Sequence, residues 1–334
     1  MKDISNYSLK AHNTFGIDSR CRRFVEFGSV EEAREAARIL REDGGRYIII
    51  GGGSNLLLTG SDTDAIVVRS AIRGFSQEGC LLTVGSGETW DSVVDYCIAH
   101  ELYGAENLSH IPGDAGASAV QNIGAYGVEV KDLIDSIEAV EIATGRRIVI
   151  SGGDCGYAYR HSKFKKEWKD RFLITRVAYR LKSTFEPNLN YGNIRAELDR
   201  QGIDKPTARQ LRDTIIAIRS EKLPDPAVEG NAGSFFMNPV VSRAQYEALA
   251  ARHDAMPHYD VDAAHVKIPA GWLIEQCGWK GRTMGRAGVH SRQALVLVNK
   301  GGATGQEIVA LCNAIRTDVA QRFGINIQPE VNII

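Results

Sequence analysis

Hydrophobic positions in the first part of the chain, up to Gly202, alternate between helical and strand-like spacing. From Ser29 to Glu42, alanine and leucine recur at helical intervals, and Gly44 follows this run. Ser29 and Glu32 form a capping box, so we predict a helix over this range. Residues 47–50, Tyr-Ile-Ile-Ile, predict a buried strand. We also expect strands at 56–58, 65–68, 81–84 and 172–181, a helix at 90–101, and a hairpin within 137–150.

The pattern changes after Gly202, where capping signals for helices become frequent. These signals pair Thr207 with Gln210, Ser242 with Gln245, and Thr304 with Glu307. The last helix carries a long apolar stripe and is expected to end at Gly324, and residues 325–334 predict an extended tail. The chain is therefore predicted to be an α+β protein with more than one domain.

Composition restricts the classes of partner. The chain has 334 residues, 43% of them hydrophobic, and a formal net charge of −1. This balance provides no global field that attracts nucleic acid or a membrane surface, so local lysines and arginines have to hold any anionic ligand. The first residues lack the apolar core of a signal peptide, and no apolar run approaches the length of a membrane span. We expect a cytoplasmic protein with no nucleic-acid or membrane partner.

Cysteine and histidine spacing argues against disulfides and metal. The six cysteines are scattered without a Cys-x-x-Cys pair, as in reduced cytosolic proteins. The eight histidines show no metal-binding spacing, so we predict that the protein holds no metal ion.

Two glycine-rich segments give the strongest indication of a ligand. Residues 51–55 read Gly-Gly-Gly-Ser-Asn and follow the predicted strand at 47–50. Residues 111–127 combine four glycines with the amide pair Gln121-Asn122. Glycine lets backbone N–H groups approach an anion closely, and the amides can bond to a heteroaromatic edge. Two such segments suit an extended dinucleotide, and the alternative is a long glycine-rich loop without a ligand.

Three further residues are candidates for chemistry, each with an ordinary alternative. Arg160, beside Tyr159, can grip a carboxylate with two parallel hydrogen bonds, although such a basic turn is often merely solvated. Ser234 precedes two phenylalanines, where its hydroxyl can deliver a proton or can simply form a turn. Glu330 lies in an apolar stretch, where a carboxyl group can act as an acid or can stay exposed. The chain has no Gly-x-Ser-x-Gly motif, which argues against a hydrolase.

Taken in order, these segments resemble the UDP-N-acetylenolpyruvoylglucosamine reductase family, also called the UDP-N-acetylmuramate dehydrogenases. The matching segments are 12–16, 51–55, 111–127, 159–160, 222–224, 233–236, 270–274 and 329–331. The resemblance implies a p-cresol methylhydroxylase-type FAD-binding fold of two α/β subdomains, over 1–75 and 76–203. It adds a C-terminal α+β substrate domain over 204–325 and a tail, 326–334, that returns to the active site. The span around Tyr191 and Tyr259 is similar to the longer form of the family.

The same resemblance implies an activity with two cofactors, FAD and NADPH. NADPH would reduce the flavin, which would then reduce UDP-N-acetyl-enolpyruvoylglucosamine to UDP-N-acetylmuramate for peptidoglycan. By resemblance, Arg160 and Glu330 stabilise the charge that develops on the substrate, and Ser234 protonates the adjacent carbon; a preformed clamp of this kind is a large catalytic effect. The implied FAD-binding residues are Gly51, Gly52, Gly53, Ser54, Asn55, Gly113, Gly116, Gln121, Asn122, Gly124, Ala125, Tyr126 and Gly127.

Substrate contacts also follow from the resemblance. They fall on Tyr159, Tyr191, Lys222, Asn238, Tyr259, Lys267 and Gln293. Met237 stands where the family pattern has lysine, which removes one cation from the expected phosphate contacts. Asp114 stands close to the expected diphosphate, so we expect it to cap a helix or to point away. The small-molecule substrate is the expected partner, and the chain is expected to be a monomer.

Two other functions fit parts of the sequence. Another FAD oxidoreductase of the same fold, such as an alcohol oxidase, would share both glycine-rich segments but not Arg160, Ser234 and Glu330 in this arrangement. A non-catalytic nucleotide-sugar binding protein would need Lys222 and Lys267 but no flavin. A yellow protein that NADPH bleaches excludes the binding protein, and reoxidation by the enolpyruvyl nucleotide excludes the oxidase.

Overall fold

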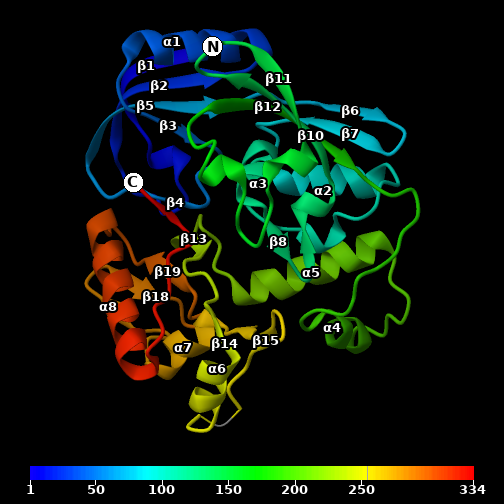
Figure 1. Ribbon diagram of the computed structural model, residues 1–334, viewed down its shortest axis with the longest axis vertical. Coiled ribbons are helices and arrows are strands. Elements are labelled where there is room, and N and C mark those ends of the chain that lie inside the picture. Colours follow the sequence, from blue (N-terminus) through cyan, green and yellow to red (C-terminus); the bar gives the residue numbers. More distant parts are fainter. Residues whose placement is uncertain (254) are drawn as a thin grey trace. The chain divides into compact units, whose positions relative to one another are not determined.

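The computed structural model describes residues 1–253 and 255–334, and the chain forms two compact units (Figure 1). The N-terminal unit comprises residues 1–8, 20–53 and 62–221. The C-terminal unit comprises residues 9–19, 54–61 and 222–334. The chain therefore passes between the units more than once. The domains expected from the sequence were continuous ranges and did not include these crossings.

The first sheet of the N-terminal unit has the strand order β1-β2-β5-β3. β1 (Lys2–Ser8) is antiparallel to β2 (Arg20–Phe27). β2 and β3 (Tyr47–Ile50) both run parallel to β5 (Asp62–Ser70). The predicted strand at 47–50 is confirmed, and the expected strand at 65–68 is the buried part of a longer one.

The second sheet of this unit is antiparallel throughout, with the order β11-β10-β12-β7-β6. Its central strand, β12, confirms the strand expected at 172–181, and most of its residues are buried. The predicted hairpin is confirmed by the pairing of β10 with β11. The strands are β6 (Phe75–Glu78), β7 (Leu81–Gly85), β10 (Ile134–Glu141), β11 (Arg147–Ser151) and β12 (Phe172–Arg180).

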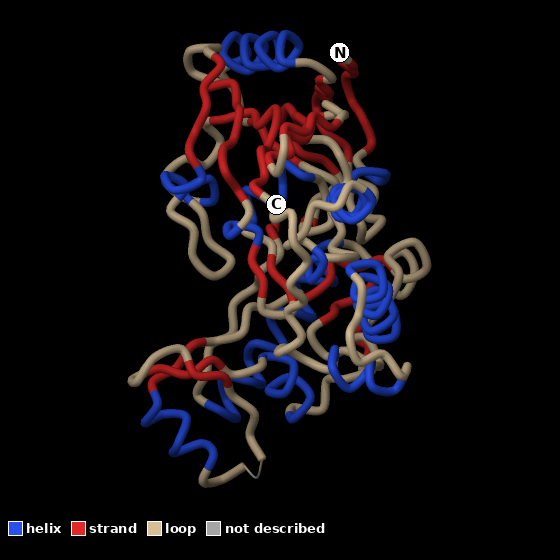
Figure 2. Tube along the Cα trace, turned by 90° about the vertical axis from the view of Figure 1, so that its right-hand side faces the viewer, coloured by secondary structure: helices blue, strands red, loops and turns tan. Residues whose placement is uncertain are grey.

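Helix α1 (Val30–Asp43) packs on strands of both sheets, and it lies above them in Figures 1 and 2. As predicted, the Ser29 hydroxyl accepts a hydrogen bond from the N–H of Glu32. Gly44 ends the helix with a φ of +62°. The buried alanines of α1 share one core with Val25 of the first sheet and Leu173 of the second, so this helix ties the two sheets together.

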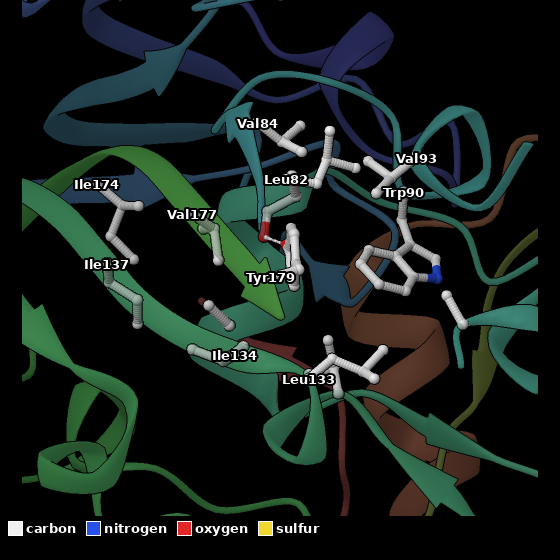
Figure 3. Close-up of a cluster of buried hydrophobic side chains, with 14 of the residues drawn as sticks. Leu82, Val84, Trp90, Val93, Leu133, Ile134, Ile137, Ile174, Val177 and Tyr179 are labelled. Carbon is white, nitrogen blue, oxygen red and sulfur yellow. Dashed lines mark hydrogen bonds between the residues drawn. The ribbon is translucent and has the colours of Figure 1, made fainter. Parts of the chain in front are cut away.

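A larger core forms under the second sheet, against α2 (Trp90–Ala99) and α3 (Ala115–Gln121) (Figure 3). The indole of Trp90 and the ring of Tyr179 meet edge to face, with centroids 5.5 Å apart. Within this core, Trp90 Nε1 donates to the carbonyl of Leu108 over 2.8 Å. The close packing of this core holds α3 in place. Helices α4 (Ile194–Arg200) and α5 (Ala208–Lys222) pack on each other nearby.

The main sheet of the C-terminal unit has the order β13-β19-β18-β17 and is antiparallel. Its strands are β13 (Gly230–Ser234), β17 (Thr283–Met284), β18 (Ala287–Val289) and β19 (Val296–Asn299). The long helix α8 (Gly305–Phe323) contacts β18 and β19. Thr304 and Glu307 form the predicted capping box, and Gly324 ends the helix with a φ of +64°.

A smaller sheet of this unit has the order β14-β16-β15. It consists of β14 (Val240–Ser242), β15 (Tyr259–Asp260) and β16 (His265–Lys267), with α6 (Arg243–Ala250) beside it and α7 (Ala270–Gln276) following it. The end of the chain also pairs: β20 (Asn332–Ile333) runs parallel to β4 (Leu56–Leu57). The tail is thus anchored next to the residues that follow the first glycine-rich segment.

The observed units differ from the sequence-based boundaries in two respects. Helix α5 belongs to the N-terminal unit up to residue 221, so the boundary expected after residue 203 lies later. Residues 9–19 and 54–61 join the C-terminal unit, because their contacts are long-range and leave no local pattern. No helix in the described ranges is both long and apolar enough to cross a bilayer.

Candidate active site

The two glycine-rich segments meet in the N-terminal unit. A Cβ added to Gly51 would lie 2.9 Å from Cβ of Ala117. A Cβ added to Gly52 would lie 3.1 Å from Oδ1 of Asp114 and 3.4 Å from Cα of Gly113. The segments therefore touch through bare backbone, which only glycine allows at this separation. Such a junction fits the requirement of a phosphate-bearing cofactor for closely approaching N–H groups.

Part of the second glycine-rich segment forms helix α3, which was not predicted because glycine is unfavourable in helices. Gly116 lies in α3 and donates a hydrogen bond to the carbonyl of Ser86 over 2.9 Å. A Cβ on Gly116 would lie 2.9 Å from Cβ of Ser86. The absence of a side chain at Gly116 therefore serves the packing of α3 against the end of β7.

The side-chain amide of Asn122 was expected to bind the cofactor, and the structure corrects this expectation. Its side chain is fully buried, and its Nδ2 donates to Glu129 over 2.8 Å and to the carbonyl of Ala158 over 2.9 Å. Its Oδ1 accepts the N–H of Lys131 over 3.1 Å. The amide is therefore engaged inside the protein and holds a left-handed turn with a φ of +47°. Oε1 of neighbouring Gln121 is buried with no hydrogen-bond partner among the described residues, so Gln121 alone keeps an acceptor for a ligand.

Arg160 braces the turn that Asn122 forms. Its Nη2 donates to the carbonyl of Gly124 over 2.9 Å, and its Nη1 lies 3.4 Å from the carbonyl of Asn122. Arg160 itself has a φ of +53°, which costs a non-glycine residue roughly 1–3 kcal/mol and is typical of functional sites. Nζ of Lys165 donates to the Arg160 carbonyl over 3.0 Å and supports this backbone. The guanidinium also lies 5.6 Å from the ring of Tyr159, so these two predicted residues are adjacent in space as well as in sequence.

A second arginine of this region, Arg219 on α5, was missed by the sequence reasoning. Its Nε donates to the carbonyl of His110 over 3.2 Å. Burial lowers the pKa of the Arg219 guanidinium; Tyr126 opposes this lowering, whereas the positive charge of Arg160 adds to it. The guanidinium of Arg219 therefore lies beside Tyr126 and within electrostatic reach of Arg160. The one available signal was the position of Arg219 one helical turn before Lys222.

Two tyrosine-glycine pairs pack against each other in the same unit. A Cβ on Gly127 would lie 3.4 Å from Cβ of Tyr191, and a Cβ on Gly192 would lie 3.4 Å from Cδ1 of Tyr126. Both glycines have positive φ, +78° and +66°. Asn107 is buried beside them, and its Nδ2 donates to the carbonyls of residues 126 and 188. The predicted cofactor segment and the predicted substrate tyrosine are thereby joined.

Asp114 makes no helix cap, although it stands at the N-cap position of α3. Of the two alternatives expected for Asp114, to cap a helix or to point away, the helix cap is therefore not formed. Its carboxylate points instead to Gly52 and to Arg69, whose Nη2 lies 3.7 Å from Oδ2. Burial raises the pKa of Asp114 to about 6, against the opposing effects of Arg69 and Arg73.

In the C-terminal unit, Ser234 ends strand β13 and is exposed. Buried Asn231 shapes the turn before it: its Oδ1 accepts the N–H of Gly233 over 2.9 Å, and its Nδ2 donates to the carbonyls of Pro224 and Glu229. Gly233 has a φ of +68°, which favours glycine at this position. The hydroxyl is thus carried by a rigid turn.

Glu330 lies on the backbone segment next to Ser234. The N–H of Glu330 donates to the carbonyl of Phe235 over 2.8 Å, and the N–H of Met237 donates to the carbonyl of Gln328 over 2.9 Å. Nδ2 of Asn55 lies 3.4 Å from the Glu330 carbonyl, so the last residue of the first glycine-rich segment lies next to the tail. The structure therefore brings Ser234, Glu330 and Asn55 together, whereas Arg160 belongs to the other unit.

Several predicted substrate residues gather around the small sheet of the C-terminal unit. Lys267 pairs in register with Tyr259, and its Nζ lies 5.9 Å from the tyrosine ring. Oδ1 of Asn238 accepts the N–H of Ala270 over 2.9 Å and so caps α7. Gln293 accepts the N–H of Leu295 over 3.3 Å, and Lys222 is exposed at the end of α5. Among the described residues, no group of three or more His, Cys, Asp or Glu side chains is placed to hold a metal ion.

Comparisons with known proteins agree with this geometry. Residues 21–151 match the model of an FAD binding domain, and residues 225–334 match the C-terminal domain of UDP-N-acetylenolpyruvoylglucosamine reductase. The chain is thus a flavin-dependent oxidoreductase with the predicted α+β organisation.

Relatives that match over nearly their full length identify the family within the flavin-dependent oxidoreductases. The chain is 51% identical to a UDP-N-acetylenolpyruvoylglucosamine reductase of Bacteroides fragilis, over 98% of this chain and 99% of that protein. It is 46% identical to one from Paraburkholderia phymatum, over 98% and 96%. A crystal structure of the Thermus caldophilus reductase has the same fold, with a TM-score of 0.69 at 21% identity over 99% and 98% of the two chains. The chain belongs to the UDP-N-acetylenolpyruvoylglucosamine reductase family.

Proposed function

We propose that this chain reduces UDP-N-acetyl-enolpyruvoylglucosamine to UDP-N-acetylmuramate, with NADPH as reductant, in the cytoplasmic synthesis of peptidoglycan precursors. The observation that carries the proposal is the adjacency of Ser234 and Glu330 on neighbouring backbone segments, with Asn55 beside them. Membership of the reductase family supports the substrate, because the relatives are named for it.

The residues present fit an FAD cofactor. Gly51 lies so close to Ala117, and Gly52 so close to Gly113, that a side chain on either would open this junction, and the acceptor Oε1 of Gln121 is buried and unused among the described residues. The reduction needs a hydride at the terminal vinyl carbon of the substrate, and supplying it is the chemistry of the bound flavin.

In this proposal, protein side chains stabilise the negative charge that develops on the substrate and supply the proton that the product needs. Arg160 and Glu330 stabilise the negative charge that develops on the enolate and carboxylate of the substrate, as groups preorganised at developing charge do. The Ser234 hydroxyl donates a proton to the carbon next to the one that accepts the hydride. The rigid turn that Asn231 builds keeps this hydroxyl oriented, and the two hydrogen bonds of Arg160 to backbone carbonyls keep its guanidinium oriented.

Binding of the nucleotide sugar is assigned to exposed polar and aromatic groups. Lys222 and Lys267 supply the local charge that a chain of net charge −1 needs for a diphosphate. Tyr159, Tyr191 and Tyr259 are between 40% and 46% exposed, which suits aromatic side chains that cover a ligand. Asn238 and Gln293 contribute amides, each of which already uses its oxygen in the protein and keeps donors for substrate.

The absorption spectrum of the pure protein, before and after anaerobic NADPH, tests the proposal. We expect a yellow protein that NADPH bleaches and that the enolpyruvyl nucleotide recolours without oxygen. A protein that stays colourless with added FAD contradicts the proposal and favours a nucleotide-sugar binding protein. If the reduced flavin is reoxidised by oxygen but not by the enolpyruvyl nucleotide, the proposed function is contradicted and an oxidase is favoured.

A further inference from the structure

The carboxyl group of Asp114 lies at the junction of the two glycine-rich segments. Only 5% of the residue is exposed, and Oδ1 lies 3.1 Å from where a Cβ on Gly52 would be. Oδ2 lies 3.7 Å from Nη2 of Arg69, beyond hydrogen-bond distance, and has no hydrogen-bond partner among the described residues. A buried carboxylate with an unsatisfied oxygen is costly, because it has lost water without gaining donors.

The charged groups that face Asp114 do not neutralise it fully. Arg69 on β5 also forms an ion pair of 2.9 Å with Glu26 of β2. Arg73, which follows β5, forms an ion pair of 3.2 Å with Glu88, which precedes α2 and itself faces Asp114. Each of the two cations is therefore shared with another acid. The raised pKa of Asp114, caused mainly by burial, agrees with this incomplete compensation.

We propose that Asp114 is a proton-accepting residue of the cofactor site, and that binding of the FAD diphosphate to the two glycine-rich segments is coupled to uptake of one proton by its carboxyl group. This inference rests on FAD binding by these segments, which belongs to the proposed function. A diphosphate brings negative charge to the junction, and like charge disfavours the ionised form of a buried carboxyl group.

Protonation removes the conflict between the acid and the anion. The neutral carboxyl group carries an O–H donor in place of a charge, so it can donate a hydrogen bond towards an anion. The bond that forms is the O–H bond of Asp114, the proton comes from solvent, and no electron is transferred. Asp114 is thereby a binding residue whose protonation state follows occupation of the site.

The test measures FAD affinity of the flavin-free full-length protein between pH 6 and pH 8, by the change in flavin fluorescence. The diphosphate of FAD does not titrate in this range, so a pH dependence reports protein groups. Because the pKa of the unliganded carboxyl group is about 6, the dissociation constant of the wild-type protein should rise with pH and approach roughly tenfold for each pH unit above pH 7, as uptake of one proton requires. Asp114→Asn, which mimics the neutral acid, should bind FAD with nearly constant affinity and more tightly than wild type at pH 8.

Calorimetry in buffers with different ionisation enthalpies measures the proton directly. At pH 7.5, binding to the wild-type protein should take up close to one proton, and binding to Asp114→Asn close to none. Asp135→Asn is the matched control, because Asp135 pairs with Arg180 on the surface and should keep the wild-type slope and proton count.

Two outcomes overturn the inference without touching the proposed function: wild-type protein that binds FAD with no proton uptake, or equal slopes in wild type and Asp114→Asn. The wild-type measurement stands even where the variant fails to fold. A wild-type protein that binds no FAD at any pH contradicts the proposed function itself.

Discussion

The backbone N–H of Glu330 donates a 2.8 Å hydrogen bond to the carbonyl of Phe235, the residue that follows Ser234. The bond joins the tail to the segment that carries the serine hydroxyl. Because backbone atoms make it, exchange of either the Ser234 or the Glu330 side chain leaves the arrangement in place. Kinetic changes in such variants can therefore be interpreted as chemistry rather than as loss of structure.

The first prediction concerns Ser234→Ala. We expect reduction of the flavin by NADPH to stay nearly normal, because that half-reaction needs no proton from Ser234. Reduction of the enolpyruvyl nucleotide should slow by roughly 100-fold or more, the usual effect of removing a general acid. Anaerobic stopped-flow absorbance measures the two half-reactions separately.

The matched control is Ser242→Ala, whose hydroxyl caps α6. It should lower the free energy of unfolding by about 1 kcal/mol and leave both half-reactions unchanged. Equal slowing of both half-reactions in Ser234→Ala would argue that the residue has a structural role only.

The second prediction concerns Arg160→Lys. An ammonium group cannot reproduce the two hydrogen bonds of the guanidinium to the carbonyls of Asn122 and Gly124, so this exchange is not conservative. Reduction of the enolpyruvyl nucleotide should slow by roughly 100-fold, measured by steady-state absorbance of NADPH. The control Arg147→Lys alters an exposed ion pair with Glu138 and should have wild-type activity. If Arg160→Lys turned over substrate at the wild-type rate, the assigned role of Arg160 in the reaction would be contradicted.

The third prediction concerns Gly116→Ala. Alanine favours a helix over glycine by about 1 kcal/mol, but here its Cβ would lie 2.9 Å from that of Ser86. Overpacking costs typically about 1–3 kcal/mol, so steric strain outweighs helix propensity. We expect a lower melting temperature and weaker FAD binding, measured by calorimetry and flavin fluorescence. Gly153→Ala, where the added Cβ meets only the Ser151 hydroxyl at 3.7 Å, should change neither quantity by much.

The fourth prediction concerns the stability of the flavin-free protein as a function of pH. Burial raises the pKa of Asp114 from 3.8 to about 6. Between these values the folded protein holds a proton that the unfolded chain has released, so the free energy of unfolding falls as pH rises from about 4 to about 6. Above this range the loss is complete and constant, at roughly 2–3 kcal/mol.

Urea denaturation at pH 4.5 and pH 8 measures this effect. Asp114→Asn should be more stable than wild type at pH 8 and should approach wild-type stability at the lower pH. A variant that is less stable than wild type at pH 8 would mean that the Asp114–Arg69 attraction outweighs the cost of burying the charge.

Local signals made much of the fold predictable. The N-cap side chain of Ser29 and the capping box of Thr304 fix helix starts within a few residues, and glycines with positive φ at 44 and 324 fix their ends. The hairpin around residue 145 follows from alternation and a turn. These features depend on neighbours in sequence, so the sequence alone contains them.

The remaining features depend on tertiary contacts. Asn122 resembles a ligand-binding amide in sequence, yet its atoms are used by Glu129, Lys131 and Ala158. Helix α3 was hidden because its glycine serves packing against Ser86 rather than flexibility. No motif in the sequence singles out Arg219, and only the fold brings Tyr126 to it. The roles of Arg160, Ser234 and Glu330 came from family resemblance, since each motif is weak by itself.

The reciprocal fit of Gly127 to Tyr191 and of Gly192 to Tyr126 has a practical consequence for exchanging segments between relatives. A larger residue at either glycine would meet an aromatic side chain and would also strain a left-handed backbone. Chimaeras that transplant one of the two stretches should therefore fail more often than chimaeras that transplant both.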